Sequence, residues 1–177
     1  LSVNQLREVS IIDLLGRNEV HLEENLIKET IHGKRILIAG AGGSIGSELV
    51  RQCLKYEPAL LVMLDNSELN LFQIEREILG NITNVLTKPL LSNIRDLDIL
   101  GKVFNEYEPQ VVFHAAAYKH VAMQEAFPWE AIKTNVHGTT NLVKLSLDHN
   151  VEKFVLVSTD KAVKPINVMG ATKRLAE

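Results

Sequence analysis

The stretch "RILIAGAGGSIGSELVRQCLKY" (35–56) joins a short apolar run, a glycine-rich turn and an amphipathic pattern. The apolar run predicts a buried strand over 35–40, and the apolar spacing after the turn predicts a helix over 44–56. Gly40, Gly43 and Gly46 permit a tight turn, close approach of a ligand to the backbone, and close helix packing. A helix that starts at such a turn offers free amides and a partial positive charge to phosphate. Ser44 and Ile45 open this helix, so we expect them to join the phosphate contact.

The rest of residues 34–177 alternates short apolar runs with amphipathic stretches. Further strands are predicted over 59–65, 84–91, 110–117 and 153–158, and helices over 67–80, 96–109, from about Pro128, and over 167–177. The third strand is the weakest, because Pro89 has no backbone N–H and belongs near a sheet edge or a strand end. A loop is expected between the fourth strand and Pro128. This alternation predicts an α/β fold, a doubly wound, Rossmann-like parallel sheet with its ligand at the carboxyl ends of the strands.

Residues 1–33 are charged and helical in pattern. "SIIDLLGR" (10–17) begins with a serine suited to a helix N-cap, and "HLEENLIKETIHG" (21–33) ends at Gly33, suited to a C-cap. We expect a helical lead-in over 1–33 and one Rossmann-like domain over 34–177. The chain begins without methionine and stops at Glu177 inside a helical pattern. We therefore expect it to be a piece of a longer protein.

The composition of the 177 residues, with 46% apolar and 23% charged residues, is typical of a globular domain. A net charge of −3 gives no basic surface for nucleic acid, so nucleic acid is not expected as a partner. The single cysteine, Cys53, lies in an amphipathic pattern and is interpreted as a core residue. The six histidines show no metal-ligand spacing, so no metal site is predicted. No apolar run approaches the length that spans a bilayer.

The second strand ends at Asp65, about 20 residues beyond the glycine turn, where an acid suits the ribose hydroxyls of a dinucleotide. Asn66 and Ser67 follow it and are expected beside the same cofactor. An acid here repels the 2′-phosphate of NADP, and no arginine follows until Arg76, so NAD is favoured over NADP. The structural alternative is that Asp65 is only a cap or turn residue before the following helix. No Gly-Lys-Ser/Thr follows the glycines, which excludes a Walker-type phosphate loop.

The segments after the third and fourth strands fall on the same rim of the predicted sheet. "SNIRD" (92–96) places Asn93 and Ile94 there. Ala115, Ala116 and Ala117 are small enough for a cofactor to lie against their backbone, although tight packing would also explain them.

Three polar residues further along the chain are candidates for substrate contact. Lys119 and His120 follow the alanines at the rim, where a charged substrate could meet them, or where they could simply face water. Asn135 lies inside a predicted helix, an unfavourable place for asparagine. It either hydrogen-bonds backbone near the site or faces solvent.

The fifth strand runs directly into Thr159, Asp160 and Lys161, three groups that can hold or move protons. Met169 and, one helical turn later, Lys173 lie on the helix that follows. A solvated turn with Asp160 as a cap is the structural alternative for the triplet. Its position at a strand end favours a catalytic function.

The segments "GAGGSIG", "HAAAYKHV", "TNVHGTTN", "VSTDKAV" and "MGATK", in this order, resemble the extended short-chain dehydrogenase/reductase superfamily. Within it the chain is most similar to the membrane-anchored UDP-N-acetylglucosamine 4,6-dehydratases of the polysaccharide biosynthesis protein family. The lead-in "LREVSIIDLLGR" is also similar to that group. The superfamily normally pairs a tyrosine with a lysine four residues later; Lys173 keeps its place and Met169 stands for the tyrosine, a substitution the group shares. Asn93 stands where an acid is usual, and the C-terminal substrate-binding part of such enzymes is missing.

The resemblance implies a lyase (hydro-lyase) reaction that begins with oxidation at C4 of UDP-N-acetylglucosamine by NAD⁺. Elimination of water across C5–C6 and return of hydride to C6 follow. Asp160 is then the acid that releases water, Lys161 the base at C5, Thr159 a hydrogen-bond partner of the 4-hydroxyl, and Lys173 the holder of the nicotinamide ribose. Burial under substrate is expected to raise the pKa of Asp160 and lower that of Lys161, against their mutual attraction. Because methionine has no titratable proton, the acceptor of the 4-hydroxyl proton is Thr159 with a water, the preferred alternative, or Lys161 acting twice.

Two other functions remain open, a nucleotide-sugar epimerase and a catalytically silent dinucleotide-binding module. Epimerases need the tyrosine and lack the Asp-Lys pair, whereas the missing tyrosine favours the silent module. The resemblance also implies a parent protein on the cytoplasmic face of the bacterial inner membrane, anchored by segments absent here. It implies self-association through the helices that begin near Pro128 and Val168. The 177 residues alone are expected to be soluble and inactive.

Overall fold

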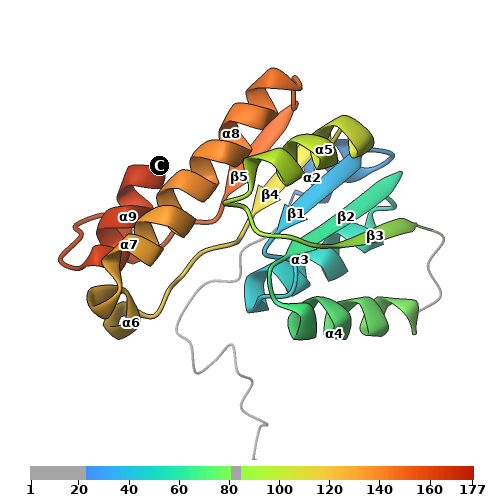
Figure 1. Ribbon diagram of the computed structural model, residues 1–177. Helices are drawn as coiled ribbons and strands as arrows, with labels where there is room; N and C mark the ends of the chain where they lie inside the picture. The colour runs from blue at the N-terminus through green and yellow to red at the C-terminus, as the bar shows by residue number, and fades with distance from the viewer. Residues whose placement is uncertain (1–22, 81–84) are drawn as a thin grey trace, which may run out of the picture.

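A computed structural model describes residues 23–80 and 85–177 of the chain, which form a parallel five-stranded sheet of order β3-β2-β1-β4-β5 (Figure 1). The strands are β1 (Arg35–Ala39), β2 (Leu60–Asp65), β3 (Leu86–Leu91), β4 (Val111–His114) and β5 (Lys153–Leu156). The helices are α2 (Glu24–Ile31), α3 (Ser44–Lys55), α4 (Glu68–Leu79), α5 (Leu97–Tyr107), α6 (Val121–Ala126), α7 (Pro128–Ala131), the π-helical turn η2 (Ile132–Gly138), α8 (Thr139–Asp148), the 3₁₀ turn η3 (Asp160–Ala162) and α9 (Val168–Ala176). The predicted doubly wound α/β fold is confirmed.

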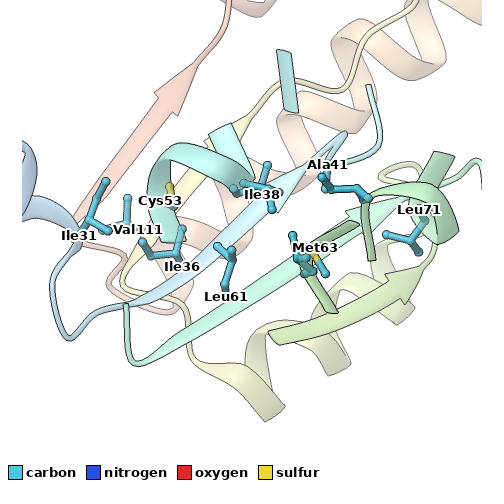
Figure 2. Close-up of a cluster of buried hydrophobic side chains, with 12 residues drawn as sticks. Ile31, Ile36, Ile38, Ala41, Cys53, Leu61, Met63, Leu71 and Val111 are labelled. Carbon is cyan, nitrogen blue, oxygen red and sulfur yellow. The ribbon is translucent and has the colours of Figure 1, made fainter. Parts of the chain in front are cut away.

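Helices cover both faces of the sheet, with α3 and α4 on one side and α5 and α8 on the other (Figure 1). The side chains of β1 show how both faces are buried, because they point alternately to the two helical layers. Ile36 and Ile38 join the cluster that contains α3 and α4 side chains, shown in Figure 2. Leu37 and Ala39 join the second cluster, with α5 and α8. Because side chains of a strand alternate between faces, a strand buried on both sides must be apolar throughout, as this one is.

The strands and long helices lie where the sequence predicts them, within a few residues at each end. Ser67 and Asp96 accept hydrogen bonds from the amides of Asn70 and Ile99 and so cap α4 and α5. Strand β3, which contains Pro89, lies at the edge of the sheet. The prediction of a loop between β4 and Pro128 is wrong, because α6 occupies part of it. Six residues are too few for a helical period, and His120 at its N-cap makes no capping bond with its side chain.

The glycine-rich turn packs too closely for side chains. Gly40 has φ +82°, a left-handed conformation that glycine adopts without strain. A Cβ on Gly46 would overlap the carbonyl oxygen of Gly40, so α3 can pack this closely on the turn only with glycine at that position. The amide of Gly43 in turn donates to the Gly40 carbonyl at 3.1 Å. These contacts leave the start of α3 facing the carboxyl ends of the strands.

The predicted lead-in falls largely on residues 1–22, outside the described residues, including the expected helix in 10–17. Of its remainder, α2 packs on the domain through Ile31, which belongs to the core cluster of Figure 2. Thr30 accepts a 2.7 Å hydrogen bond from Lys153 of β5. Within residues 23–80 and 85–177, no helix has the length and apolar character needed to cross a bilayer.

Replacing Gly46 with alanine is expected to destabilise the fold by about 1–3 kcal/mol or more, because the added methyl must displace the Gly40 carbonyl. Gly101 provides the matched control, since a Cβ there meets nothing within 4 Å and it lies inside α5. Gly101→Ala should stabilise by roughly 0.5–1 kcal/mol through helix propensity. Urea unfolding of both variants measures the difference, and equal effects of the same sign would contradict this account of the turn.

Candidate functional site

Two adjoining pockets open at the carboxyl ends of the strands. The first lies between the glycine-rich turn and the ends of β2 and β3. It is lined by Gly40, Gly43, Leu64, Asp65, Asn66, Ser67, Asn70, Ser92, Asn93, Ile94, Ala115, Ala116, Ala117, Tyr118 and Thr134. Most residues that the sequence predicts beside a cofactor therefore share this pocket.

The second pocket lies between the start of α3 and the segment after β5. It is lined by Gly43, Ser44, Ile45, Gly46, Ala115, Ala117, Tyr118, Lys119, Val157, Ser158, Thr159, Lys161, Met169 and Lys173. Gly43, Ala115, Ala117 and Tyr118 line both pockets, so a long ligand could run from one into the other.

Asp65 joins the second strand to the glycine-rich turn. One carboxylate oxygen accepts from the Gly42 amide at 2.8 Å, and the other accepts from the Ser67 amide at 2.8 Å. The side chain thus makes a backbone contact in the turn before α4, as the structural alternative proposes. The residue also lines the first pocket. Because each carboxylate oxygen carries two lone pairs, both oxygens keep capacity for a hydroxyl donor.

Asn135 lies in η2 and is 1% exposed. Its side-chain oxygen accepts from the amide of Tyr118 at 2.8 Å, and its amide nitrogen donates to the Tyr118 carbonyl at 3.0 Å. The same nitrogen donates to the hydroxyl of Thr172 at 3.0 Å. Of the two placements that the sequence allows for Asn135, the structure shows the first: the side chain lies in the interior and hydrogen-bonds backbone near the site. A π-helical turn brings it there, a feature that is common at functional sites.

His114, at the end of β4, is buried and was not singled out from the sequence. Its Nε2 lies 2.8 Å from the hydroxyl oxygen of Thr139, whose hydroxyl donates to the Asn135 carbonyl at 2.7 Å. Since that hydroxyl proton is already used, Nε2 must carry the proton and Nδ1 is an acceptor. Nδ1 is buried and has no hydrogen-bond partner among the described residues. Burial, and secondarily the charge of Lys173, lowers the pKa of His114 to about 3, so this imidazole stays neutral.

Tyr118, also missed from the sequence, lies where the pockets meet. Its ring has the Arg95 guanidinium 5.5 Å from its centre, within the range of a cation–π contact. Arg95 is fixed in turn by a 2.6 Å ion pair with Glu130 and a 2.8 Å hydrogen bond to Thr134. The backbone of Tyr118 is held by Asn135 and its ring is flanked by Arg95, so both parts of the residue are positioned.

Lys119 and His120 do not share one position. Lys119 lines the second pocket, whereas His120 lines a neighbouring, largely apolar recess with Met123 and Phe127. Lys119 lines both the second pocket and this recess, and both Lys119 and His120 are exposed.

The Thr159–Asp160–Lys161 triplet forms the rim of the second pocket at η3. The hydroxyl of Thr159 donates to Asp160 at 3.0 Å, and the Lys161 ammonium lies 3.3 Å from the same carboxylate oxygen. The Asp160 side chain is 86% exposed. The Thr159 hydrogen bond, followed by that of Lys161, lowers the pKa of Asp160, opposite to the rise expected for an acid catalyst. The contacts with Thr159 and Lys161 favour the charged carboxylate, and within the described residues it is too exposed for burial to oppose them.

Helix α9 places two buried residues in the second pocket. Met169 is 4% exposed and Lys173 5% exposed. The Lys173 ammonium donates to the Val157 carbonyl at 2.7 Å, and the Val157 amide donates to the carbonyl of His114. Burial lowers the pKa of Lys173. The predicted Thr159, Lys161, Met169 and Lys173 therefore meet in one pocket, with Asp160 on its outer edge.

Comparison with known proteins identifies the family. The model of the family described as polysaccharide biosynthesis protein matches residues 36–177. The chain belongs to the polysaccharide biosynthesis protein family. This confirms the resemblance predicted from the sequence, including membership of the short-chain dehydrogenase/reductase superfamily.

Members of the polysaccharide biosynthesis protein family and solved structures are similar to the chain over most of its length. It is 44% identical to the capsular polysaccharide biosynthesis protein CapD of Staphylococcus aureus over all of the chain and 30% of the relative. It is 35% identical to a UDP-N-acetylglucosamine 4,6-dehydratase (inverting) of Campylobacter jejuni over 80% of the chain and 41% of the relative. The structure of the UDP-Glc/GlcNAc 4-epimerase of Campylobacter jejuni matches with a TM-score of 0.71 and 25% identity, over 81% of the chain and 47% of the epimerase. The chain thus spans less than half the length of these relatives.

His114 should make stability pH-dependent. Its unfolded imidazole takes up a proton below about pH 6.5, whereas the folded one stays neutral until about pH 3, so its stabilising contribution is complete above pH 6.5 and is lost as pH falls. Between pH 7 and pH 5 this one residue should cost about 2 kcal/mol of unfolding free energy. Urea unfolding at both pH values, for wild type and His114→Asn, isolates the contribution from all other groups. The loss should shrink in the variant, and an unchanged loss would refute the neutral, buried imidazole.

Proposed function

We propose that the protein containing this chain is an NAD-dependent nucleotide-sugar 4,6-dehydratase of polysaccharide biosynthesis. Its substrate is proposed to be UDP-N-acetylglucosamine, and its product a UDP-4-keto-6-deoxy-N-acetylhexosamine. The observation that carries this proposal is the meeting of Thr159, Lys161 and Lys173 in one pocket, with Asp160 at its rim. A general acid and a general base side by side are what elimination of water requires. The relative named as a UDP-N-acetylglucosamine 4,6-dehydratase supports the same choice.

The residues of the first pocket fit the adenosine and diphosphate parts of a dinucleotide. Gly43, which lines this pocket, is the N-cap residue of α3 and makes no side-chain cap, so the first amides of the helix would be available to phosphate oxygens. Asp65 offers remaining acceptor capacity to ribose hydroxyls, and its charge disfavours a 2′-phosphate. Asn93 and Ile94 would flank the adenine, and Ala115–Ala117 would lie beneath the diphosphate. We therefore assign NAD rather than NADP.

In the second pocket Lys173 would hydrogen-bond the nicotinamide ribose, next to Met169. The bound cofactor supplies the hydride acceptor for C4 and later the hydride for C6. Thr159 would bind the 4-hydroxyl, Lys161 would remove the C5 proton, and Asp160 would protonate the departing 6-hydroxyl. Because Met169 cannot accept a proton, we assign that step to Thr159 acting through a water, in preference to a second use of Lys161.

The exposed ion pair sets a condition on this chemistry. Asp160 must be protonated to act as an acid, yet its pKa is lowered here by Thr159 and Lys161. Substrate bound over the rim would exclude water from the carboxylate and raise its pKa. Residues beyond this chain, which the longer relatives have, would complete that cover. The 177 residues alone are accordingly expected to show no turnover.

An epimerase is the second candidate, favoured by the structural similarity to the UDP-Glc/GlcNAc 4-epimerase of Campylobacter jejuni. Epimerases return hydride to C4 and need no acid at C6, so Asp160 would then have no role. A silent dinucleotide-binding module would need neither Asp160 nor Lys161. Self-association through α7–α8 and α9, and attachment to the cytoplasmic face of the inner membrane through other segments, remain part of the proposal.

Turnover by the full-length protein distinguishes these functions. Incubation with UDP-N-acetylglucosamine and catalytic NAD⁺ in D₂O should give a 6-methyl proton NMR signal, a C4 ketone and deuterium in the sugar. Asp160→Asn and Lys161→Ala should each lower the rate about 100-fold or more, as loss of a general acid or base does. Lys164→Ala is the matched control, since Lys164 is an exposed lysine of the same loop. A C4 epimer as the only product would establish the epimerase, and no change to the sugar with NAD⁺ bound would support the silent module.

Cofactor choice should depend on Asp65. Asp65→Asn should lower the preference for NAD⁺ over NADP⁺ about tenfold, because a charge near the 2′-position is removed while one acceptor oxygen remains for Ser67. Calorimetric titration of both dinucleotides measures the ratio, with thermal unfolding as the check on the Gly42 contact. An unchanged ratio would show that Asp65 serves the fold alone.

A further inference from the structure

The beginning of α9 is held by a residue from another helix. The amide of Val168, the first residue of α9, donates to a carboxylate oxygen of Glu125 in α6 at 2.7 Å. Asn167 supplies the usual N-cap by accepting from the Gly170 amide at 2.7 Å. One of the free amides of the helix start is therefore satisfied by a side chain of α6, which Figure 1 shows beside α9.

The chain before α9 gives the helix little support. Residues 163–166 are all exposed, with Val163 at 75% and Ile166 at 95%. A segment with so few buried contacts does not by itself set where the next helix begins. At this end α9 is held by the Glu125 contact and by the approach of Gly170 to the carbonyl of Lys161, where a Cβ would overlap that oxygen. One turn further on, the hydrogen bond from Asn135 to Thr172 also holds the helix.

The position of this helix start determines where two site residues lie. Met169 is next to Val168, and Lys173 is little more than one turn further on. Because a helix moves as a rigid element, a shift at its first turn shifts the Lys173 ammonium from the Val157 carbonyl. The carboxylate of Glu125 also lies at the positive end of the helix dipole, which favours it there.

We propose that Glu125 is a positioning residue of the site, which fixes α9 and thereby Lys173 and Met169 relative to the cofactor. The inference rests on the proposed function, because it assumes that Lys173 holds the nicotinamide ribose. It assigns Glu125 no contact with substrate or cofactor. It also links α6, which walls the recess containing His120 and Met123, to the helix that carries Lys173.

Both partners of the hydrogen bond can be removed separately. Glu125→Ala removes the acceptor. Val168→Pro removes the donor, and proline is well tolerated at the first position of a helix. The residue before it, Asn167, has φ −146° and ψ 162°, an extended conformation that a following proline permits. Glu125→Gln keeps an acceptor oxygen without the charge.

The test is a fluorescence titration of NADH on the full-length protein. Glu125→Ala and Val168→Pro should each weaken binding about tenfold, and the double variant should be no weaker than either. Glu125→Gln should bind within about twofold of wild type, since the acceptor remains. Glu152→Ala is the control: Glu152 is exposed and accepts from Lys34 and Gln110, contacts outside both pockets, so affinity should not change.

Three results would overturn the inference. Unchanged affinity in both single variants would show that α9 is placed without this contact. Additive losses in the double variant would mean that the two residues act separately. Loss of binding in Glu125→Gln equal to that in Glu125→Ala would reject the hydrogen bond as the cause. If wild type itself binds no NADH, the proposed function fails first, which is a distinct outcome from any of these.

Discussion

The site depends on one buried amide. Asn135 binds the backbone of Tyr118 with both ends of its side chain and also donates to Thr172 of α9. In a parallel sheet the loops at the carboxyl ends of the strands belong to different crossover connections. The hydrogen bonds of the sheet therefore do not hold these loops to one another. Asn135 connects two of them. Its carbonyl accepts from Thr139, whose oxygen is paired with His114, so the connection extends down to β4. Burying an amide without hydrogen bonds destabilises a fold. The hydrogen bonds that satisfy the Asn135 amide are the same ones that position the Tyr118 backbone and α9.

The two halves of the site differ in their degree of completion. Lys173 is buried and bonded to Val157, and Ser44, Ile45 and Gly46 at the start of α3 line the second pocket with it. In contrast, Asp160 is exposed and its pKa is lowered, the reverse of what acid catalysis needs. A preformed half for the proposed cofactor and an open half for the proposed substrate agree with a chain that covers 41% of the related dehydratase. In the proposed mechanism the described residues hold the cofactor. Segments that the longer relatives have would exclude water from the Asp160 rim.

Much of the fold follows from local patterns. Apolar runs and glycines predicted the five strands of the described residues, and the predicted helices over 67–80 and 96–109 begin at Ser67 and Asp96, whose capping bonds join near neighbours in sequence. The features that the sequence missed have separate causes. Helix α6 is too short to show a period. His114 looked like any strand residue until its Thr139 contact and the charge of Lys173 were seen. The two alternatives for Asn135 could not be separated from the sequence, because its partners lie 17 and 37 residues away. The exposure of Asp160, which goes with its lowered pKa in the absence of substrate, is not recorded in any motif.

The central claim is that Asn135 holds the rim loop and α9 together as one cofactor site. The most direct test is the affinity of the full-length protein for NAD⁺, measured by calorimetry, in wild type and Asn135→Asp. The carboxylate keeps the shape of the amide but has no N–H for Tyr118 and Thr172. Asn105→Asp, the same change at an exposed position of α5, is the control. The account predicts a loss of about tenfold or more in affinity for Asn135→Asp alone. Equal affinity in a variant that remains folded would contradict it.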